Sequence, residues 1–144
     1  MIEQTTSDSD EGTPRRFDVE LFIVHPTLNP TEITAELGLE PQNSHRVGDP
    51  RQTPKGSPLP GTYRDTRWRH SIELELKDQW FSEEVTKLVD RLAPHKAFFR
   101  RLRKSGGKAQ VIVQFFGDYF GDEISRETLS KMIDLELDLG IECF

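Results

Sequence analysis

Side chains able to bind an anion stand at both ends of one long excursion of the chain, between positions 41 and 66. Arg46 can hold a carboxylate or phosphate through two parallel hydrogen bonds, Gly48 can let a ligand approach the backbone, and Trp68 offers a flat contact. Both ends of a loop return to one scaffold, so we expect these groups to converge. The predicted ligand- or partner-binding residues are Ser44, Arg46, Gly48, Asp49, Trp68 and His70.

The same residues also fit a purely structural interpretation. The Gly-Asp-Pro sequence at positions 48–50 is typical of a turn, and Arg46 can pair with the nearby aspartate or with a carbonyl at a helix end. Trp68 shares a face with Ile72, where tryptophan is usually part of the core. His70 lies on the same apolar face and is expected to be half-buried and hydrogen-bonded. The sequence leaves both interpretations open.

A hydrolase-type enzyme that uses His45 or His70 with Asp49 is one alternative function. It requires folding to bring these residues together. The histidines have no paired spacing for zinc, no serine lies in a Gly-x-Ser-x-Gly turn, and there is no phosphate-binding Gly-x-x-x-x-Gly-Lys loop. We therefore assign no catalytic residue and expect no metal and no cofactor.

An RNA-binding domain is a second alternative. The segment from Lys108 to Phe115 has the outline of an RNA-recognition strand, but the base-stacking positions would fall at Gln110 and Ile112, which are not aromatic. The basic cluster at positions 100–104 lies at the end of a predicted helix, where cations complement the helix dipole. The net charge of −6 also disfavours polyanions, so we expect no nucleic-acid partner.

These candidate residues are positioned by alternating strand and helix signals. Apolar alternation predicts strands at 17–24, 68–76 and 109–116, and from about position 138 to the end. Helical periodicity predicts helices over 30–37, from Ser82, from about Pro94, and from Ser125 to about position 135. Between positions 41 and 66 there is no periodicity, and the segment is expected to be an irregular loop.

Two phrases nearly repeat: 37–40 reads Leu-Gly-Leu-Glu, and 139–142 reads Leu-Gly-Ile-Glu. Each is preceded by a helix that opens with a capping residue, Asn29 or Ser125, placed after an apolar residue. An apolar strand comes before each helix. The chain is thus expected to be α+β: a single sheet of four to five strands with helices mainly on one face. The arrangement is expected to be ferredoxin-like, with two pseudo-repeated βαβ units.

Composition limits the other properties. Residues 1–16 are polar and acidic and are expected to form a disordered tail, which leaves 17–144 as a single α+β domain. There is no apolar run of about 18 residues, so we expect no membrane partner and a cytoplasmic location. Cys143 cannot form an internal disulfide, because it is the one cysteine of the chain, and it is expected to be a small buried hydrophobe.

Several of these features occur together in a fixed order. Leu-Gly-Leu-Glu-Pro at 37–41 is followed by Ser-His-Arg-Val-Gly-Asp-Pro at 44–50, by Thr-Arg-Trp at 66–68, and by a final strand that closes on Phe144. In this pattern the chain resembles a bacterial family catalogued as domain of unknown function 4279, over about residues 17–144. The resemblance implies the fold and its boundaries. It brings no activity that could be assigned to these residues.

The favoured function is a small binding or interaction module. Its partner is expected to be a protein or a small anionic ligand, held at the excursion of residues 41–66. Arg46 and Trp68 are the candidate anchors, because arginine and tryptophan are over-represented at binding hot spots. The oligomeric state is left open.

Overall fold

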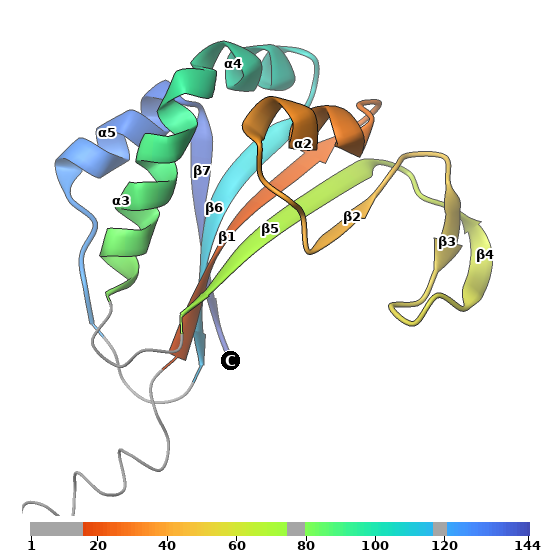
Figure 1. The fold of residues 1–144 in the computed structure, drawn as a ribbon, viewed down its shortest axis with the longest axis horizontal. Coiled ribbons are helices and arrows are strands. Elements are labelled where there is room, and N and C mark those ends of the chain that lie inside the picture. Colours follow the sequence, from red (N-terminus) through yellow and green to blue (C-terminus); the bar gives the residue numbers. More distant parts are fainter. Residues whose placement is uncertain (1–15, 75–79, 117–120) are drawn as a thin grey trace, which may run out of the picture.

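The computed structural model describes residues 16–74, 80–116 and 121–144. Its main sheet has five strands in the order β2-β5-β1-β6-β7, and every neighbouring pair is antiparallel except β6 and β7, which are parallel (Figure 1). The strands are β1 (Arg16–His25), β2 (Asn43–His45), β5 (Thr66–Leu74), β6 (Lys108–Phe116) and β7 (Leu137–Cys143). The expected α+β class and a main sheet of five strands are confirmed, while residues 50–62 contribute a second, two-stranded sheet that was not expected.

Helices cover one face of this sheet (Figure 1). They are α2 (Pro30–Leu37), α3 (Phe81–Leu92), a short 3-10 turn (Ala93–His95), α4 (Lys96–Lys104) and α5 (Arg126–Asp134). Side chains alternate between the two faces of a strand, so every second residue of β1, from Phe17 to Ile23, points into the core under the helices. The partners of these residues on β5 and β6 share that face, and they include Trp68 and Val111.

The predicted helix signals act as expected. Asn29 Oδ1 accepts a hydrogen bond from the Thr31 N–H at 3.1 Å, and Ser125 Oγ accepts one from the Thr128 N–H at 3.2 Å. Gly38 ends α2 with φ of 67°, a left-handed conformation that favours glycine. The cap residues and the direction of the chain after α2 therefore follow from local sequence.

The ferredoxin-like arrangement with two repeated βαβ units is not confirmed. A βαβ unit joins parallel strands. This holds for β6, α5 and β7, but β1 and β5 are antiparallel neighbours. The difference arises because the strand that follows α2 is the short β2. Both β1 and β2 are antiparallel to β5, so β5 lies between them and starts beside His25, where β1 ends.

The excursion of residues 41–66 is not the irregular loop that its sequence suggested. Its first part is β2, which extends the main sheet beside β5. Its middle forms a hairpin of β3 (Pro50–Gln52) and β4 (Pro58–Thr62), which projects away from the helices (Figure 1). Strand periodicity is absent because these strands are short and exposed and have no apolar face to bury.

The last helix and strand divide close to the predicted boundary. α5 ends at Asp134, the backbone turns at Glu136 with φ of 56°, and β7 begins at Leu137. The prediction that Cys143 is buried is wrong, because it lies at the exposed end of an edge strand. The tail was predicted over residues 1–16. Residues 1–15 lie outside the described residues, and Arg16 belongs to β1.

Within the part of the chain that the structure describes, no helix is long and apolar enough to cross a membrane.

Candidate functional site

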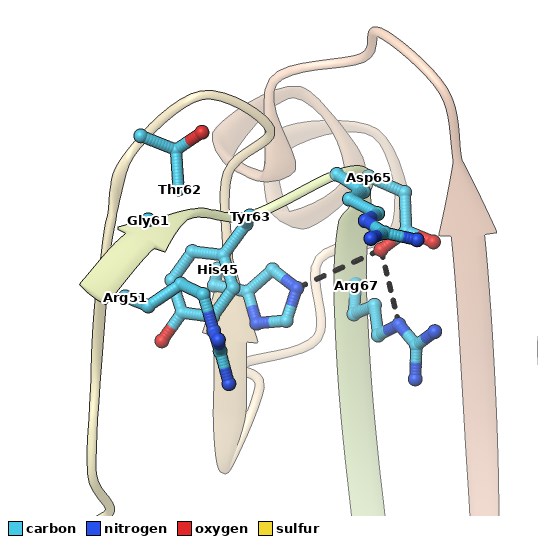
Figure 2. Close-up of a pocket in the computed structure, with 8 residues that line it drawn as sticks. His45, Arg51, Gly61, Thr62, Tyr63, Asp65 and Arg67 are labelled. Carbon is cyan, nitrogen blue, oxygen red and sulfur yellow. Dashed lines mark hydrogen bonds and ion pairs between the residues drawn. The ribbon is translucent and has the colours of Figure 1, made fainter. Parts of the chain in front are cut away.

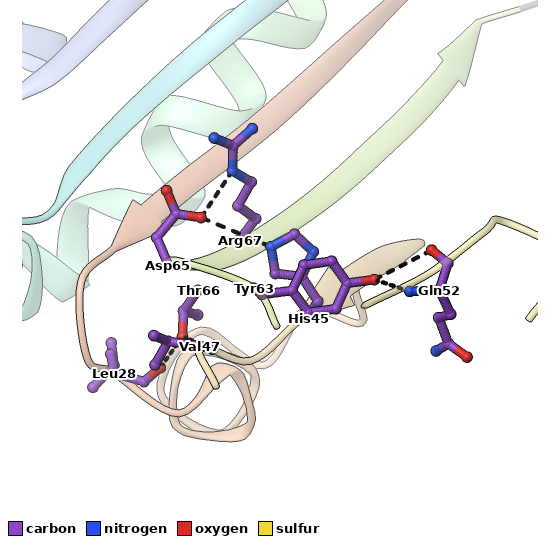
Figure 3. A network of polar contacts seen from close by, with 8 residues as sticks. All are labelled: Leu28, His45, Val47, Gln52, Tyr63, Asp65, Thr66 and Arg67. Carbon is purple, nitrogen blue, oxygen red and sulfur yellow. Dashed lines mark hydrogen bonds and ion pairs between the residues drawn. The ribbon is translucent and has the colours of Figure 1, made fainter. Parts of the chain in front are cut away.

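The two ends of the excursion meet as predicted, and a buried threonine fastens them. β2 pairs with β5, with Ser44 opposite Trp68 and His45 opposite Arg67. The Thr66 hydroxyl accepts a hydrogen bond from the Val47 N–H at 3.1 Å and donates one to the Leu28 carbonyl oxygen (Figure 3). Because Thr66 is fully buried, it holds the loop before α2, the end of β2 and the start of β5 in one place.

A second contact fixes the β3–β4 hairpin against β2. The His45 and Tyr63 rings stack with centroids 3.6 Å apart and planes 3° from parallel. The Tyr63 hydroxyl accepts a hydrogen bond from the Gln52 N–H at 3.3 Å and lies 3.4 Å from the Gln52 carbonyl oxygen (Figure 3). The Gly48 N–H also donates to the Tyr63 carbonyl oxygen at 2.9 Å. The hairpin is therefore held at a defined distance from the sheet.

These contacts leave a depression on the helix-free side of the sheet, which we call the basic groove and define by His45, Arg51, Tyr63, Arg64, Arg67 and Arg69. His45 borders three adjoining cavities of about 660, 350 and 230 Å³. Figure 2 shows His45, Tyr63, Arg51 and Arg67 gathered around the largest of them. The groove is open to solvent along its length, since Arg51, Arg64 and Arg67 are exposed.

The excursion and the first residues of β5 together carry a charge opposite to that of the whole chain. Residues 42–69 contain six Lys or Arg and two Asp, a net charge of +4 within a chain of net charge −6. Asp65 accepts from Arg67 Nε at 3.0 Å, and Arg51 Nη1 donates only a long hydrogen bond of 3.4 Å to the Pro60 carbonyl oxygen. Among the described residues no acidic side chain pairs with Arg46, Arg51 or Arg64. The excess positive charge is thus concentrated at the groove and the turn beside it.

His45 is the titratable group at the centre of the groove. Burial lowers the pKa of His45 from its ordinary value, and the Asp65 carboxylate, whose Oδ1 lies 3.8 Å from His45 Nε2, opposes this effect. His45 is therefore neutral at neutral pH, and the fixed positive charge of the groove comes from its arginines.

Arg69 links the groove to the helix-free face of β1. Its Nη1 donates to Glu20 Oε2 at 2.9 Å, and its guanidinium lies 4.2 Å from the centroid of the Phe22 ring. The Ser71 hydroxyl donates to the other oxygen of Glu20 at 2.9 Å. Glu20 is buried, so this pairing holds Arg69 in position beside the smallest cavity.

Three of the predicted site residues face the helix-covered side instead. Trp68 is fully buried, and its indole N–H donates to Thr34 Oγ1 at 3.0 Å. His70 lies on the same face, where Nδ1 is 2.7 Å from the Glu40 carbonyl oxygen, and Ser44 is paired with Trp68 in the strand register. These positions match the structural interpretation of Trp68 and His70. They also put His45 and His70 on opposite faces, so the sheet separates the two histidines of the hydrolase alternative.

The other three predicted residues form the turn that follows β2. The Asp49 N–H donates to the Arg46 carbonyl oxygen at 3.1 Å, and Gly48 has φ of 87° with open space where a Cβ would lie. Gly48 is needed for this left-handed turn rather than for a close approach to the backbone. Arg46 and Asp49 are exposed, and no ion pair joins their side chains.

Sequence reasoning missed the side chains that line the groove, namely Arg51, Tyr63, Arg64, Arg67 and Arg69. One signal was available, because Arg67 and Arg69 alternate with Trp68 and so mark a polar face of the predicted strand. The positive charge of residues 42–69 within an acidic chain was another. The stack of Tyr63 on His45 had no local signal, since it depends on how the hairpin folds back.

Over residues 16–74, 80–116 and 121–144 there is no group of three or more His, Cys, Asp or Glu side chains arranged to hold a metal ion.

Comparison with known proteins identifies one family. Neither the curated proteins nor the solved structures give a match to this chain. The family model described as Domain of unknown function (DUF4279) matches residues 15–143, which include every strand and helix described above. The chain therefore belongs to the DUF4279 family.

Proposed function

We propose that this chain is a binding module whose basic groove holds an acidic segment of a protein partner. One observation carries the proposal: Arg51 and Arg64 line the same cavity, and neither pairs with an acidic side chain among the described residues. Arginine recognises carboxylates through two parallel hydrogen bonds. Exposed arginines around one cavity therefore favour a ligand that brings its own negative charge.

The shape of the groove favours an extended ligand over a compact one. Three cavities adjoin at His45, and the arginines are spread along them from Arg51 on the hairpin to Arg69 on β5. A small anion would contact one or two of these guanidinium groups. A peptide segment with several carboxylates could contact most of them, with the stacked Tyr63 and His45 rings as an apolar surface between the charges.

The remaining charge of the chain argues for a short acidic segment. Outside residues 42–69 the chain carries a net charge of −10, the difference between −6 and +4. A long polyanion such as a nucleic acid would extend from the groove over this negative surface and be repelled. A segment of a few acidic residues can stay within the positive region. Arg46 lies in the turn beside the groove, whereas Trp68 and His70 face the helices and have no part in the proposal.

The test uses a fluorescent hexaglutamate peptide as the probe, with binding followed by fluorescence anisotropy. The double variant Arg51→Ala/Arg64→Ala should bind about tenfold more weakly, because losing about 1.4 kcal/mol changes an affinity tenfold. Arg46→Ala should weaken binding less and leave the melting temperature unchanged. The affinity should also fall with added salt, since charges about 10 Å apart are screened at 0.1 M.

Arg100→Ala is the matched control, because Arg100 is an exposed arginine on α4, away from the groove. It should bind the peptide as the unmodified protein does. Equal losses in Arg100→Ala and in the groove variant would mean that binding follows total charge, and would contradict the proposal. No binding to the peptide at low salt would contradict it as well, and binding of inorganic phosphate alone would favour a small-anion site.

A further inference from the structure

Exposed apolar side chains gather at the β7 edge of the sheet. Of the seven large hydrophobic side chains that are exposed in the described residues, five belong to α5, β7 or the residue after it: Leu129, Ile133, Leu139, Ile141 and Phe144. Ile133 is 75% exposed, Ile141 is 64% exposed and Phe144 is 71% exposed. Since single exposed apolar residues are common but clusters of them mark contact surfaces, this edge is a candidate interface.

The backbone of β7 is also open to pairing. β7 is the last strand of the sheet, and its register places Cys143 opposite Phe115. The Phe144 N–H donates to the Phe115 carbonyl oxygen at 3.0 Å, so the even-numbered residues of β7 direct their N–H and C=O groups toward β6. The backbone N–H and C=O groups of Leu139, Ile141 and Cys143 therefore point away from β6, toward the open edge of the sheet. β7 has no Pro, Lys or Arg to block an added strand.

We propose that two copies of this chain associate through β7, with the two β7 strands antiparallel and the main sheets continuous across a twofold axis. Leu139 and Ile141 face the helix-covered side, as do their partners Val111 and Val113 on β6. α5 packs on β7 at that side, so the α5 helices of the two copies lie next to each other above the joined strands. Leu129 and Ile133 are then covered together with the strand residues.

Charge selects the register of the two strands. Outward-facing residues must lie opposite one another, so the twofold axis must pass through a residue of β7, and we compare Gly140 at the middle of the strand with Ile141 in its more exposed half. An axis at Gly140 places Asp138 of each copy opposite Glu142 of the other, which is unfavourable for like charges. An axis at Ile141 instead places Glu142 opposite Gly140 and Leu139 opposite Cys143. The register centred on Ile141 is therefore the one we adopt.

The apolar area agrees with that of a small stable dimer. Given their exposed fractions, the five side chains present on the order of 400 Å² of apolar surface per copy, or ~800 Å² for two copies. Four of them lie on the helix-covered side, and Phe144 lies on the other face, where its ring stacks on that of Phe116. A specific interface buries ~1,200–2,000 Å² in total, of which somewhat more than half is apolar. The chain's own first 15 residues are a poor alternative cover, because Met1 and Ile2 are the only large apolar side chains among them.

Sedimentation equilibrium between about 1 µM and about 1 mM tests the association, a range that spans binding free energies of ~8 to ~4 kcal/mol. The unmodified chain of 16.6 kDa should sediment as a dimer at the upper concentrations, and Ile141→Lys should stay monomeric. Leu59→Lys, at an exposed apolar position on β4, is the matched control and should still dimerise. A monomeric unmodified chain over the whole range, or a dimeric Ile141→Lys, would overturn the proposal.

Cross-linking tests the register. In the proposed dimer Leu139 lies about 5.5 Å from the partner's Cys143, measured between Cα atoms, which is within disulfide range. Leu139→Cys should therefore give a covalent dimer on oxidation, and the added change Cys143→Ser should abolish it. Within one copy these two positions are about 13 Å apart and cannot be joined. Failure of Leu139→Cys to cross-link at concentrations where sedimentation shows a dimer would overturn the proposed register.

Discussion

Replacing Thr66 with valine tests the contact that brings the ends of the excursion together. Valine keeps the shape of threonine but has no hydroxyl group, so the Val47 N–H loses its acceptor and the Leu28 carbonyl oxygen loses its donor. Thr66 is fully buried, and water cannot readily replace either hydrogen bond. The substitution therefore isolates the polar contribution of this residue from its packing.

The expected loss can be worked out from these two bonds. Leaving a buried polar group without a partner costs about 1–3 kcal/mol. Both groups are affected, and partial relaxation toward solvent reduces the sum, so Thr66→Val should lower the free energy of unfolding by about 2–4 kcal/mol. Thr62→Val makes the same chemical change at an exposed position of β4 and should stay within about 0.5 kcal/mol.

Urea denaturation followed by tryptophan fluorescence measures this difference, because Trp68 lies in the core beside Thr66. The transition midpoint should fall in Thr66→Val while the slope stays unchanged, as expected when stability changes but the exposed surface does not. A loss for Thr66→Val no larger than that for Thr62→Val would refute the anchoring role. The groove would then be held by the His45–Tyr63 contact rather than by Thr66.

Two further predictions concern the core and the pH dependence of stability. Leu37→Ala should lower the free energy of unfolding by ~2–5 kcal/mol and Ile72→Ala by less, because Leu37 is buried and Ile72 is half-buried. If urea denaturation shows no change for either variant, the core is assigned wrongly. Burial lowers the pKa of His25, whose Nδ1 accepts hydrogen bonds from the N–H groups of Thr27 and Leu28. The unfolded chain therefore takes up a proton first, so stability should be full above about pH 6.5 and should fall as the pH drops toward the lowered pKa. His25→Asn keeps an acceptor for those N–H groups, and an equally steep acid loss in that variant would assign the effect to other residues.

The parts of the fold that depend on local chemistry could be predicted from the sequence. Asn29, Gly38 and Ser125 begin or end helices through side chains and backbone angles within a few residues. The alternation around Trp68 predicted a half-buried strand, which β5 is, but it left Trp68 open between a core and a binding role. These features hold because each is determined by neighbours in the chain.

The features that depend on distant contacts could not be predicted in this way. β1 and β5 are antiparallel because residues 41–66 end beside His25, so that β5 starts where β1 ends. The two similar strand–helix signals in the sequence do not specify this pairing. The exposure of Cys143 depends on β7 being an edge strand, which is a property of the whole sheet.

The candidate site could likewise be predicted only in part. The sequence correctly placed Arg46 near the β5 end of the excursion, but it assigned the binding role to Trp68 and His70, which the strand register turns toward the helices. Strand alternation alone cannot tell which face the helices will cover. Once β5 is placed, Arg67 and Arg69 fall on the helix-free face and the groove follows from their neighbours.

An NMR titration with unlabelled hexaglutamate peptide tests the basic groove most directly, by following the side-chain Nε–H signals of the arginines in ¹⁵N-labelled protein. We expect the signals of Arg51, Arg64 and Arg67 to shift together and to saturate, while that of Arg100 on α4 stays in place. Shifts of similar size at Arg100, or no shift at the three groove arginines, would contradict the assignment of this surface as the binding site.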